Sequence, residues 1–455
     1  MLSLAVPVIL AEIGWVSMGI VDTIMVGPLG PAAIGAVGVG SMLFLALAVF
    51  GIGLLLGLDT LVAQSFGAGR VDECHRWLHH GFALALLLTP PLIAMAWIGT
   101  ATLDVWGFSP EVHVLTRPYL DIVIWSTLPL LLYAAFRRYL QAINAVGPVM
   151  FALLSANLVN AVANWVLIYG HLGAPALGTN GAAWATLVSR VYMAGVLLAA
   201  IVWHDRRQGS GLFDVPPIIE PARLRRLVTL GLPAALQVVL EMGVFAGASA
   251  LAGRLAPAAL AAHQIVLNMA AFTFMVPLGL ASAAAVRVGQ AVGRGDAPGA
   301  ARAGWTALAV GLSFMSIAAL TFLLVPAILV RLFTPDPAVV GIGVSLLFIA
   351  ALFQLFDGTQ GVLTGALRGL GDTRTPMLWN LAGHWFLGLP FGYSLCFVWG
   401  LGVSGLWVGL STGLIVVGLV LLVVWTRRVG TLARLTPVAR SKGAAYQPQA
   451  ESLEP

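Results

Sequence analysis

The stretch GPLGPAAIGAVG, residues 27–38, is followed 226 residues later by the related stretch GRLAPAALAAHQ, residues 253–264. Both keep a glycine, a leucine and a Pro-Ala-Ala triplet in one ungapped register. The same register pairs Pro7 with Pro233, Gly53-Leu54 with Gly279-Leu280, Gln64 with Gln290, Gly67 with Gly293, Gly69 with Gly295 and Arg76 with Arg302. Matches among abundant Ala, Leu and Gly are expected by chance, but a single register through Pro, Gln and Arg is not. The sequence therefore contains an internal duplication.

The composition is that of an integral membrane protein. Hydrophobic residues make up 60% of the 455 residues and charged residues only 9%, whereas soluble proteins carry about 25% charged residues. The apolar character runs from the first residues to about residue 425, which excludes a soluble domain for all but the tail. The apolar stretch begins at once, without a charged region and cleavage site, so we expect a retained span and not a signal peptide.

The apolar segments predict twelve transmembrane helices, because about 20 apolar residues cross a bilayer. The expected segments are 3–27, 32–58, 77–102, 117–142, 148–170, 180–204, 226–251, 257–285, 304–330, 338–365, 378–400 and 402–426. An even number of spans in each copy makes the duplicated halves parallel repeats. The predicted fold is an all-α polytopic membrane protein with two six-helix lobes around a central cleft.

The predicted domain boundaries follow the main polar interruption of the chain. We expect an N-lobe over residues 1–208, a cytoplasmic linker over 209–225, a C-lobe over 226–429 and a disordered cytoplasmic tail over 430–455. With both termini inside, 19 of the 23 basic residues fall in cytoplasmic segments, three fall outside and Arg190 falls within a span. Because Lys and Arg are retained in short cytoplasmic loops, this asymmetry predicts that both termini are cytoplasmic. We also expect a monomer in the bilayer.

Several functional classes are disfavoured by the sequence. The basic residues lie between apolar runs and form no block, so nucleic acid is not an expected partner. Cys74 and Cys396 form neither a disulfide framework nor a CxxC metal site, and no cofactor is expected. Neither HExxH nor GxSxG occurs, which argues against an intramembrane enzyme. A channel would carry a repeated selectivity element, whereas the acids of this chain are not repeated.

Six acids within or near the spans are candidates for chemistry, because buried membrane charges are costly and persist with a partner or a task. They are Glu12, Asp22, Asp59, Asp121, Glu241 and Asp357. Glu241 and Asp357 lie at membrane depth in the second half. The 226-residue register places Trp15 at the position of Glu241, and a second register, shifted by 224, places Tyr133 opposite Asp357. We interpret these unrepeated acids as specialised chemistry; the alternative is a protonated carboxyl that bonds between helices.

Several motifs, in order, resemble the multidrug and toxic compound extrusion family, and its NorM-like branch most. They are GIVDTIMVGPLGPAAIGAVG (19–38), LDTLVAQSFGAG (58–69), AAHQIVLN (261–268), MVPLG (275–279), VGQAVGRGD (288–296) and GALRGLGDTRTPM (365–377). The resemblance implies a bacterial inner-membrane antiporter that exports organic cations and other amphiphilic compounds in exchange for protons or sodium ions. The family usually has a segment before its first span, so the first helix is expected to be shortened here, or the recorded start to be late.

The place of Asp22 in VDTIMVG resembles the family's acid of the first helix, which implies a proton or cation role. Asn160 and Asn164, four residues apart on one helix face, and Thr186 are the matching polar candidates of the first half. Amide, hydroxyl and carboxylate oxygens suit a hard cation such as sodium, and the alternative is hydrogen bonding between helices. Asp59 and Asp121 are interpreted as structural, and Glu12 is left open between cleft lining and packing.

The expected mechanism is competition at the C-lobe acids. Ionised Glu241 and Asp357 would favour a lipophilic cationic substrate, and an arriving proton or sodium ion would neutralise them and lower that affinity. Sodium is accordingly a candidate ligand of both carboxylates. A lipid-linked oligosaccharide flippase of the same superfamily is the alternative function; it should place more cationic residues in the cleft.

Overall fold

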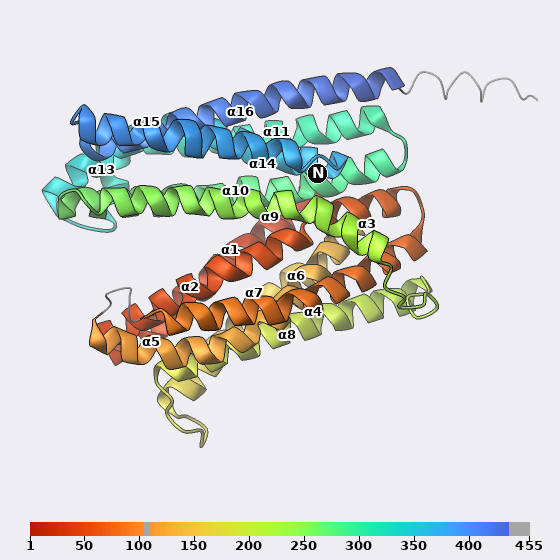
Figure 1. Cartoon of the computed structure of the whole chain (residues 1–455), viewed down its shortest axis with the longest axis horizontal. Coiled ribbons are helices and arrows are strands. Elements are labelled where there is room, and N and C mark those ends of the chain that lie inside the picture. Colours follow the sequence, from red (N-terminus) through yellow and green to blue (C-terminus); the bar gives the residue numbers. More distant parts are fainter. Residues whose placement is uncertain (104–108, 436–455) are drawn as a thin grey trace, which may run out of the picture.

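The computed structural model describes residues 1–103 and 109–435, and these residues form a bundle of long helices (Figure 1). Twelve helical segments are long and apolar enough to cross a membrane, as the sequence predicts. The first six are built from α1 (Leu2–Val26), η1 (Gly27–Leu29), α2 (Pro31–Leu55), α3 (Gly57–Gly67), α4 (Val71–Ala101), α5 (Pro110–Val123), η3 (Ile124–Ser126), α6 (Thr127–Ala142), α7 (Val146–Tyr169) and α8 (Thr179–Gln208). These helices are called the N-lobe.

The second six segments, called the C-lobe, follow a connection between Gln208 and Pro221. They are built from α9 (Pro221–Ala252), α10 (Pro257–Gly293), α11 (Ala297–Leu324), α12 (Pro326–Arg331), α13 (Pro337–Leu370), α14 (Arg374–Asn380), η4 (Leu381–Gly388), α15 (Leu389–Tyr393), η5 (Ser394–Val398) and α16 (Gly402–Leu435). In Figure 1 the two lobes approach each other at the end that carries this connection and diverge toward the other end. We call the first end the linker end.

The helices differ from the predicted spans mainly in length. At the linker end α3 continues to Gly67 and α10 to Gly293, and each helix is followed within two residues by a glycine of positive φ, Gly69 or Gly295. A hydropathy pattern stops at the first polar residues, whereas the helix stops where the backbone turns. Helix α16 continues to Leu435 and so includes residues 430–435 of the expected tail. The rest of that expected tail, 436–455, lies outside the described residues.

The ninth predicted span, 304–330, is interrupted. Helix α11 ends at Leu324, and Pro326 begins the short helix α12. Proline lacks a backbone N–H and is tolerated in the first turn of a helix but not in its interior. The apolar composition of the segment hides this break, which hydropathy alone does not detect.

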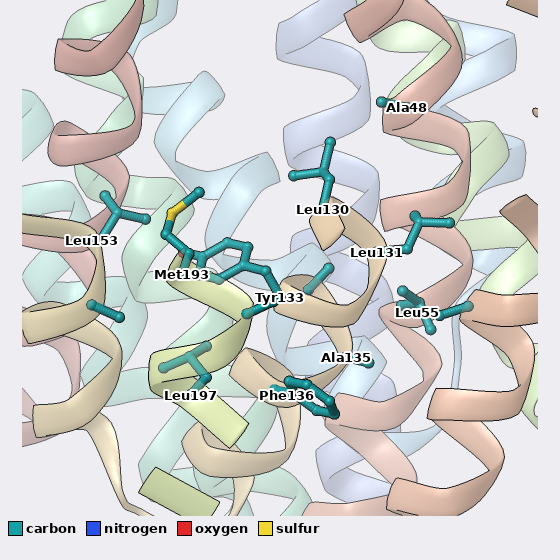
Figure 2. Packing of buried hydrophobic residues seen from close by; sticks show 14 of the residues in the cluster. Ala48, Leu55, Leu130, Leu131, Tyr133, Ala135, Phe136, Leu153, Met193 and Leu197 are labelled. Carbon is teal, nitrogen blue, oxygen red and sulfur yellow. The ribbon is translucent and has the colours of Figure 1, made fainter. Parts of the chain in front are cut away.

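Both lobes contain clusters of buried apolar side chains, and one C-lobe cluster also includes Leu4 and Ala5 of α1. In the N-lobe the core joins α6, through Leu130, Leu131 and Phe136, to Met193 and Leu197 of α8 (Figure 2). These side chains are at most 3% exposed. Without a hydrophobic force between helices in lipid, such interdigitated packing holds the bundle together.

The duplication is visible in the contacts between the lobes. A Cβ atom at Gly53 of α2 would clash with Ala235 of α9, and one at Gly279 of α10 would clash with Ile9 of α1. Both pairs are related by the 226-residue register. Close backbone approach through glycine is typical of membrane helix interfaces.

A second pair of contacts obeys the same symmetry. A Cβ at Gly67 would overlap the Gln290 carbonyl group, and one at Gly293 would overlap the Gln64 carbonyl group. The side-chain amides also cross the lobes, since Gln64 Nε2 donates to Gly369 O at 3.0 Å and Gln290 Nε2 donates to Ala142 O at 2.8 Å. The lobes are thus tightly joined at the linker end.

A buried ion-pair cluster lies in this junction. The Asp59 side chain of α3 is fully buried between Arg138 Nη1 of α6 and Arg368 Nε of α13, each 3.4 Å from its Oδ2. Arg138 Nη1 also donates to Ser282 Oγ of α10 at 3.2 Å. The cluster therefore connects both lobes and carries two cations against one anion. It supports the structural interpretation of Asp59 and adds two arginines that sequence reasoning counted as loop charges.

Removing the central carboxylate is expected to destabilise the protein strongly. Asp59→Asn would leave two buried guanidinium groups without an opposite charge, which costs about 3–5 kcal/mol for a broken buried pair. Thermal unfolding of the detergent-purified protein measures the effect. Asp121→Asn is the matched control, because Asp121 is exposed and makes no ion pair within the described residues. An unchanged unfolding temperature in Asp59→Asn would contradict the role of this cluster.

Candidate functional site

The two acids predicted for the C-lobe lie together between α9 and α13. Gln360 Nε2 of α13 donates to Glu241 Oε1 of α9 at 3.2 Å. Asp357 is one helical turn before Gln360 and lies close enough to Glu241 for the charges to interact. Asp357 is 7% exposed and Gln360 1% exposed. The structure thus brings the two predicted carboxylates to one polar patch.

The Asp357 carboxylate has no hydrogen-bond donor among the described residues. Neutral polar groups surround the patch, yet their oxygens are not used: Gln360 Oε1, Gln354 Oε1 and Asn380 Oδ1 are buried without a hydrogen-bond partner. A buried carboxylate with no donor is costly when ionised. It becomes favourable when a proton or a cation neutralises it.

Asn380 and His384 extend this patch on α14 and η4. The Asn380 amide lies beside Glu241 and is fully buried, but neither of its side-chain polar atoms meets hydrogen-bond geometry. His384 Nδ1 lies 3.1 Å from Asn380 O, and its Nε2 has no partner. The π-helical segment η4 begins directly after Asn380, and π-helical turns occur frequently at functional sites.

Sequence reasoning missed Gln360 and Asn380. A signal was present, because Gln360 lies three residues after Asp357 and so shares its helix face. Asn380 was hidden because a single amide in an apolar span is commonly a packing group.

The N-lobe cluster assembles as the sequence predicts. Asn164 Nδ2 of α7 donates to Asp22 Oδ1 of α1 at 2.7 Å and to Asn160 Oδ1 at 3.1 Å. Thr186 Oγ1 of α8 lies 3.3 Å from Asp22 Oδ2 and 3.0 Å from Ala182 O, and its single proton serves one of these acceptors at a time. All four predicted side chains are buried, with Asp22 8% exposed.

Arg190 is close enough to Asp22 for its charge to act on the carboxylate. Its guanidinium lies 4.4 Å from the centroid of the Phe44 ring, and Nη1 donates to Ser126 Oγ at 2.5 Å. The Asp22 carboxylate therefore has hydrogen-bond donors and a nearby cation, whereas Asp357 has neither within the part of the chain that the structure describes. The two lobes hold acids in different electrostatic surroundings.

The N-lobe counterpart of the Glu241 and Asp357 pair is aromatic. Trp15 and Tyr133, which the repeat registers place opposite these acids, stack with ring centroids 6.3 Å apart and planes at 10°. The residues at this position thus connect α1 with α6 in the N-lobe, and the repeat-related helices α9 and α13 in the C-lobe. One lobe fills it with rings and the other with carboxylates, so the frame is symmetric and the chemistry is not.

Other polar side chains of the spans have structural partners. Glu12, left open by the sequence, forms a buried ion pair with Arg137. Trp407 Nε1 donates to His263 Nδ1 at 2.9 Å, and His263 Nε2 lies 2.9 Å from Ser249 Oγ, so this histidine packs helices. The spans also contain more arginine than the sequence suggested, because Arg137 and Arg138 are at most 8% exposed. Arg137 pairs with Glu12, and Arg138 shares Asp59 with Arg368.

No group of three or more His, Cys, Asp or Glu side chains within the described residues could hold a metal ion. Any cation bound at the C-lobe patch would therefore depend on the neutral oxygens as well as on the two carboxylates.

The comparisons with known proteins identify the family. The MatE family model matches residues 7–166 and again residues 233–394, two segments that start 226 residues apart as the internal repeat predicts. A probable multidrug resistance protein NorM of Mesorhizobium japonicum is 37% identical over 94% of this chain and 93% of its own length. The multidrug resistance protein NorM of Vibrio cholerae is 34% identical over 92% of this chain and 93% of its own length.

Solved structures agree on the fold. A MATE structure in a bent conformation aligns over 95% of each chain with a TM-score of 0.85 at 20% identity. A MOP superfamily transporter of Pyrococcus furiosus aligns over 95% of this chain and 96% of its own with a TM-score of 0.84 at 20% identity. The chain belongs to the MatE family and is similar to NorM members of that family. It is a multi-pass membrane transporter and not an enzyme.

Proposed function

We propose that the protein exports lipophilic or cationic organic compounds across the bacterial inner membrane in exchange for inward protons or sodium ions. The NorM-named relatives support a multidrug substrate range. The observation that carries the proposal is the Asp357 carboxylate, which is buried beside Glu241 and has neither a hydrogen-bond donor nor a basic partner among the described residues. Together with Glu241, which accepts one hydrogen bond from Gln360, this acid creates a site that needs positive charge, which either a cationic substrate or a coupling ion supplies.

Transport follows from competition for this charge. When both acids are ionised, an organic cation gains electrostatic energy in a site of low dielectric constant. When a proton or a sodium ion occupies the site, that gain is lost and the substrate is released. A sodium ion would find carboxylate oxygens together with the unused oxygens of Gln360 and Asn380, the oxygen-rich set that hard cations prefer.

The rocking of the two lobes provides the conformational cycle. Their junction at the linker end is built of glycine contacts and buried ion pairs, and the ribbons diverge toward the opposite end (Figure 1). We propose that the linker end is cytoplasmic and that this arrangement faces outward. Three of the nineteen basic residues counted inside, Arg137, Arg138 and Arg368, are buried and are therefore not loop charges. The remaining sixteen, against three outside, still support a cytoplasmic linker end.

The topology can be tested with single cysteines. Pro217→Cys at the linker end is expected to resist an impermeant thiol reagent added outside intact cells, and Pro175→Cys at the opposite end is expected to react. Both positions are exposed, and both native cysteines, Cys74 and Cys396, are buried. Reaction of Pro217→Cys in intact cells, with Pro175→Cys protected, would reverse the proposed orientation.

The function itself is tested by dye accumulation in cells with and without the gene. We expect cells that express the protein to retain less of a lipophilic cationic dye, and collapse of the ion gradients to abolish the difference. Equal dye retention with and without the gene would contradict export of this substrate class.

A further inference from the structure

A basic groove lies at the linker end, and none of its lining residues belongs to the two acidic clusters described above. Three adjoining cavities of about 340, 450 and 540 Å³ follow one another along the first turns of α9. The first and second cavities share Leu61, Gln64 and Arg226. The second and third share Thr229, Leu230 and Gly371. Their walls come from α3, the α3–α4 turn, α4, α9, α10, the end of α13 with the α13–α14 turn, the start of α14, and α16. The groove therefore runs along the seam between the lobes.

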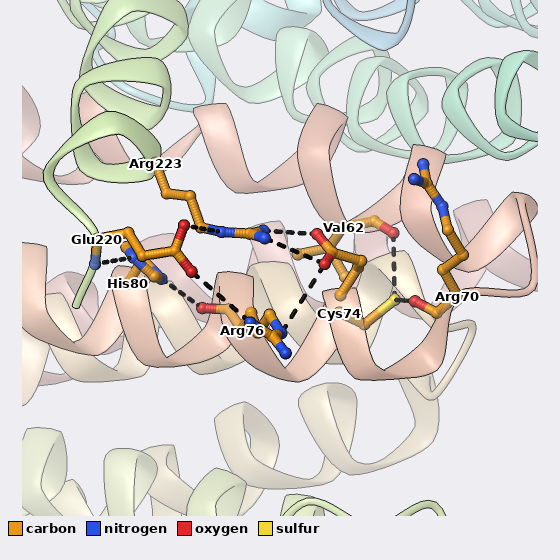
Figure 3. A network of polar contacts seen from close by, with 8 residues as sticks. Val62, Arg70, Cys74, Arg76, His80, Glu220 and Arg223 are labelled. Carbon is orange, nitrogen blue, oxygen red and sulfur yellow. Dashed lines mark hydrogen bonds and ion pairs between the residues drawn. The ribbon is translucent and has the colours of Figure 1, made fainter. Parts of the chain in front are cut away.

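The acids of this groove are already paired. Arg223 Nη1 and Nη2 donate hydrogen bonds to the Glu73 carboxylate at 2.5 and 3.1 Å, and Arg223 Nε donates one to Glu220 at 2.9 Å. At the other end Asp372 accepts Arg428 Nη2 at 2.7 Å. Figure 3 shows Arg223 held in this network beside Glu220, whereas Arg70 points away from it.

Four arginines of the groove have no such partner. Arg70, Arg225, Arg226 and Arg374 line the cavities and form no ion pair with the described residues. Arginine presents a planar set of donors that matches the oxygens of a phosphate group. Guanidinium groups that line one groove without an ion pair to the described residues therefore fit a phosphate-bearing anion.

The surroundings favour a lipid as the source of that phosphate. The connection that leads into α9 exposes Phe213, Ile218 and Ile219 to 70%, 65% and 41%. Ile218 and Ile219 directly precede Glu220, which lines the first cavity. Exposed apolar side chains beside arginines at the end of transmembrane helices suit an acyl chain together with its charged headgroup.

We propose that this groove binds the phosphate of an anionic phospholipid headgroup, with the acyl chains against the apolar residues of the connection. Arg70 belongs to the N-lobe, while Arg225, Arg226 and Arg374 belong to the C-lobe. A phosphate bound by Arg70 and Arg226 ties the two lobes at the linker end. The lipid then favours the arrangement closed at this end, because rocking of the lobes separates its two arginine partners.

Three short-chain probes distinguish the sources of the phosphate on the full-length protein in detergent. Dioctanoyl phosphatidylglycerol is expected to raise the thermal unfolding temperature saturably, whereas dioctanoyl phosphatidylcholine, with equal chains and no net charge, is not. Glycerol 3-phosphate carries the phosphate without chains and is expected to have little effect. An equal effect of glycerol 3-phosphate would assign the groove to a soluble phosphate and overturn the lipid proposal.

Variants locate the effect. Arg70→Gln with Arg226→Gln is expected to weaken phosphatidylglycerol binding roughly fivefold per arginine removed. Arg70→Lys with Arg226→Lys, which keeps the charge, should restore part of it. The matched control is Arg254→Gln with Arg331→Gln, which removes the same charge from exposed positions outside the groove. Ile218→Ser with Ile219→Ser should also weaken phosphatidylglycerol binding.

The proposal is overturned if the double variant Arg70→Gln with Arg226→Gln responds to phosphatidylglycerol as strongly as the parent does. It is also overturned if phosphatidylcholine raises the unfolding temperature as much as phosphatidylglycerol. All four substituted arginines are exposed and form no ion pair with any residue in 1–103 or 109–435, so folding should persist in each variant. Because the readout is binding and not transport, failure here is separate from failure of the proposed export function.

Discussion

Replacing Glu241 with glutamine or Asp357 with asparagine is expected to reduce efflux of a lipophilic cationic dye by roughly tenfold or more. Each change keeps the size and the hydrogen-bonding capacity of the side chain but removes its charge. The site then no longer favours a cation, and the coupling ion has no carboxylate to neutralise. Efflux from energised cells, normalised to the amount of protein in the membrane, measures the loss.

The control for this experiment is Asp121→Asn, which makes the same chemical change at an exposed acid. Expression and thermal stability of all three variants should stay near the parent, because neither Glu241 nor Asp357 forms an ion pair within the described residues. Normal efflux by both C-lobe variants would show that the acids are packing groups, and the competition mechanism would be wrong.

The second large effect is expected at Asp22. Asp22→Asn should weaken coupling to the ion gradient by roughly five- to tenfold, while affinity for substrate on the de-energised protein changes little. The physical reason is the separate construction of the two clusters: Asp22 is bound by α7 and α8, whereas Glu241 is bound by α13. A carboxylate that already has donors is suited to exchange a small cation.

Comparing Glu241→Gln with Asp22→Asn shows whether the substrate and the coupling ion share one site or use two separate sites. Glu241→Gln is expected to lower substrate affinity, or both affinity and coupling, and Asp22→Asn mainly coupling. Dye binding by fluorescence anisotropy on purified protein gives the first quantity, and gradient-driven uptake into proteoliposomes gives the second. Equal losses of both in the two variants would indicate one shared site.

Much of the fold could be predicted because each predictive signal depends on local properties. Twelve apolar segments and the repeat register needed only composition and residue identity, and the register later reappeared as the reciprocal contacts of Gly53 and Gly279. Helix ends could not be predicted as well, because Gly69 and Gly295 end helices well after hydropathy has fallen.

The candidate site was predicted in part for the same reason. Glu241, Asp357 and Asp22 are conspicuous as acids in apolar segments, and Asn164 lies on the same helix face as Asn160. The partners of Asp59 could not be predicted, since Arg138 and Arg368 are 230 residues apart in sequence. Their pairing depends on how the lobes meet, which a single sequence does not encode locally.

The most direct test of the central claim is transport by purified protein in proteoliposomes under one imposed gradient at a time. Vesicles that are more acidic inside than the bath, or richer in sodium inside, should accumulate a cationic dye, because antiport moves dye inward as the ion leaves. At least one gradient should drive uptake, and the variant carrying both Glu241→Gln and Asp357→Asn should show none. Equal uptake with and without either gradient, or full uptake by the double variant, would contradict cation-coupled export.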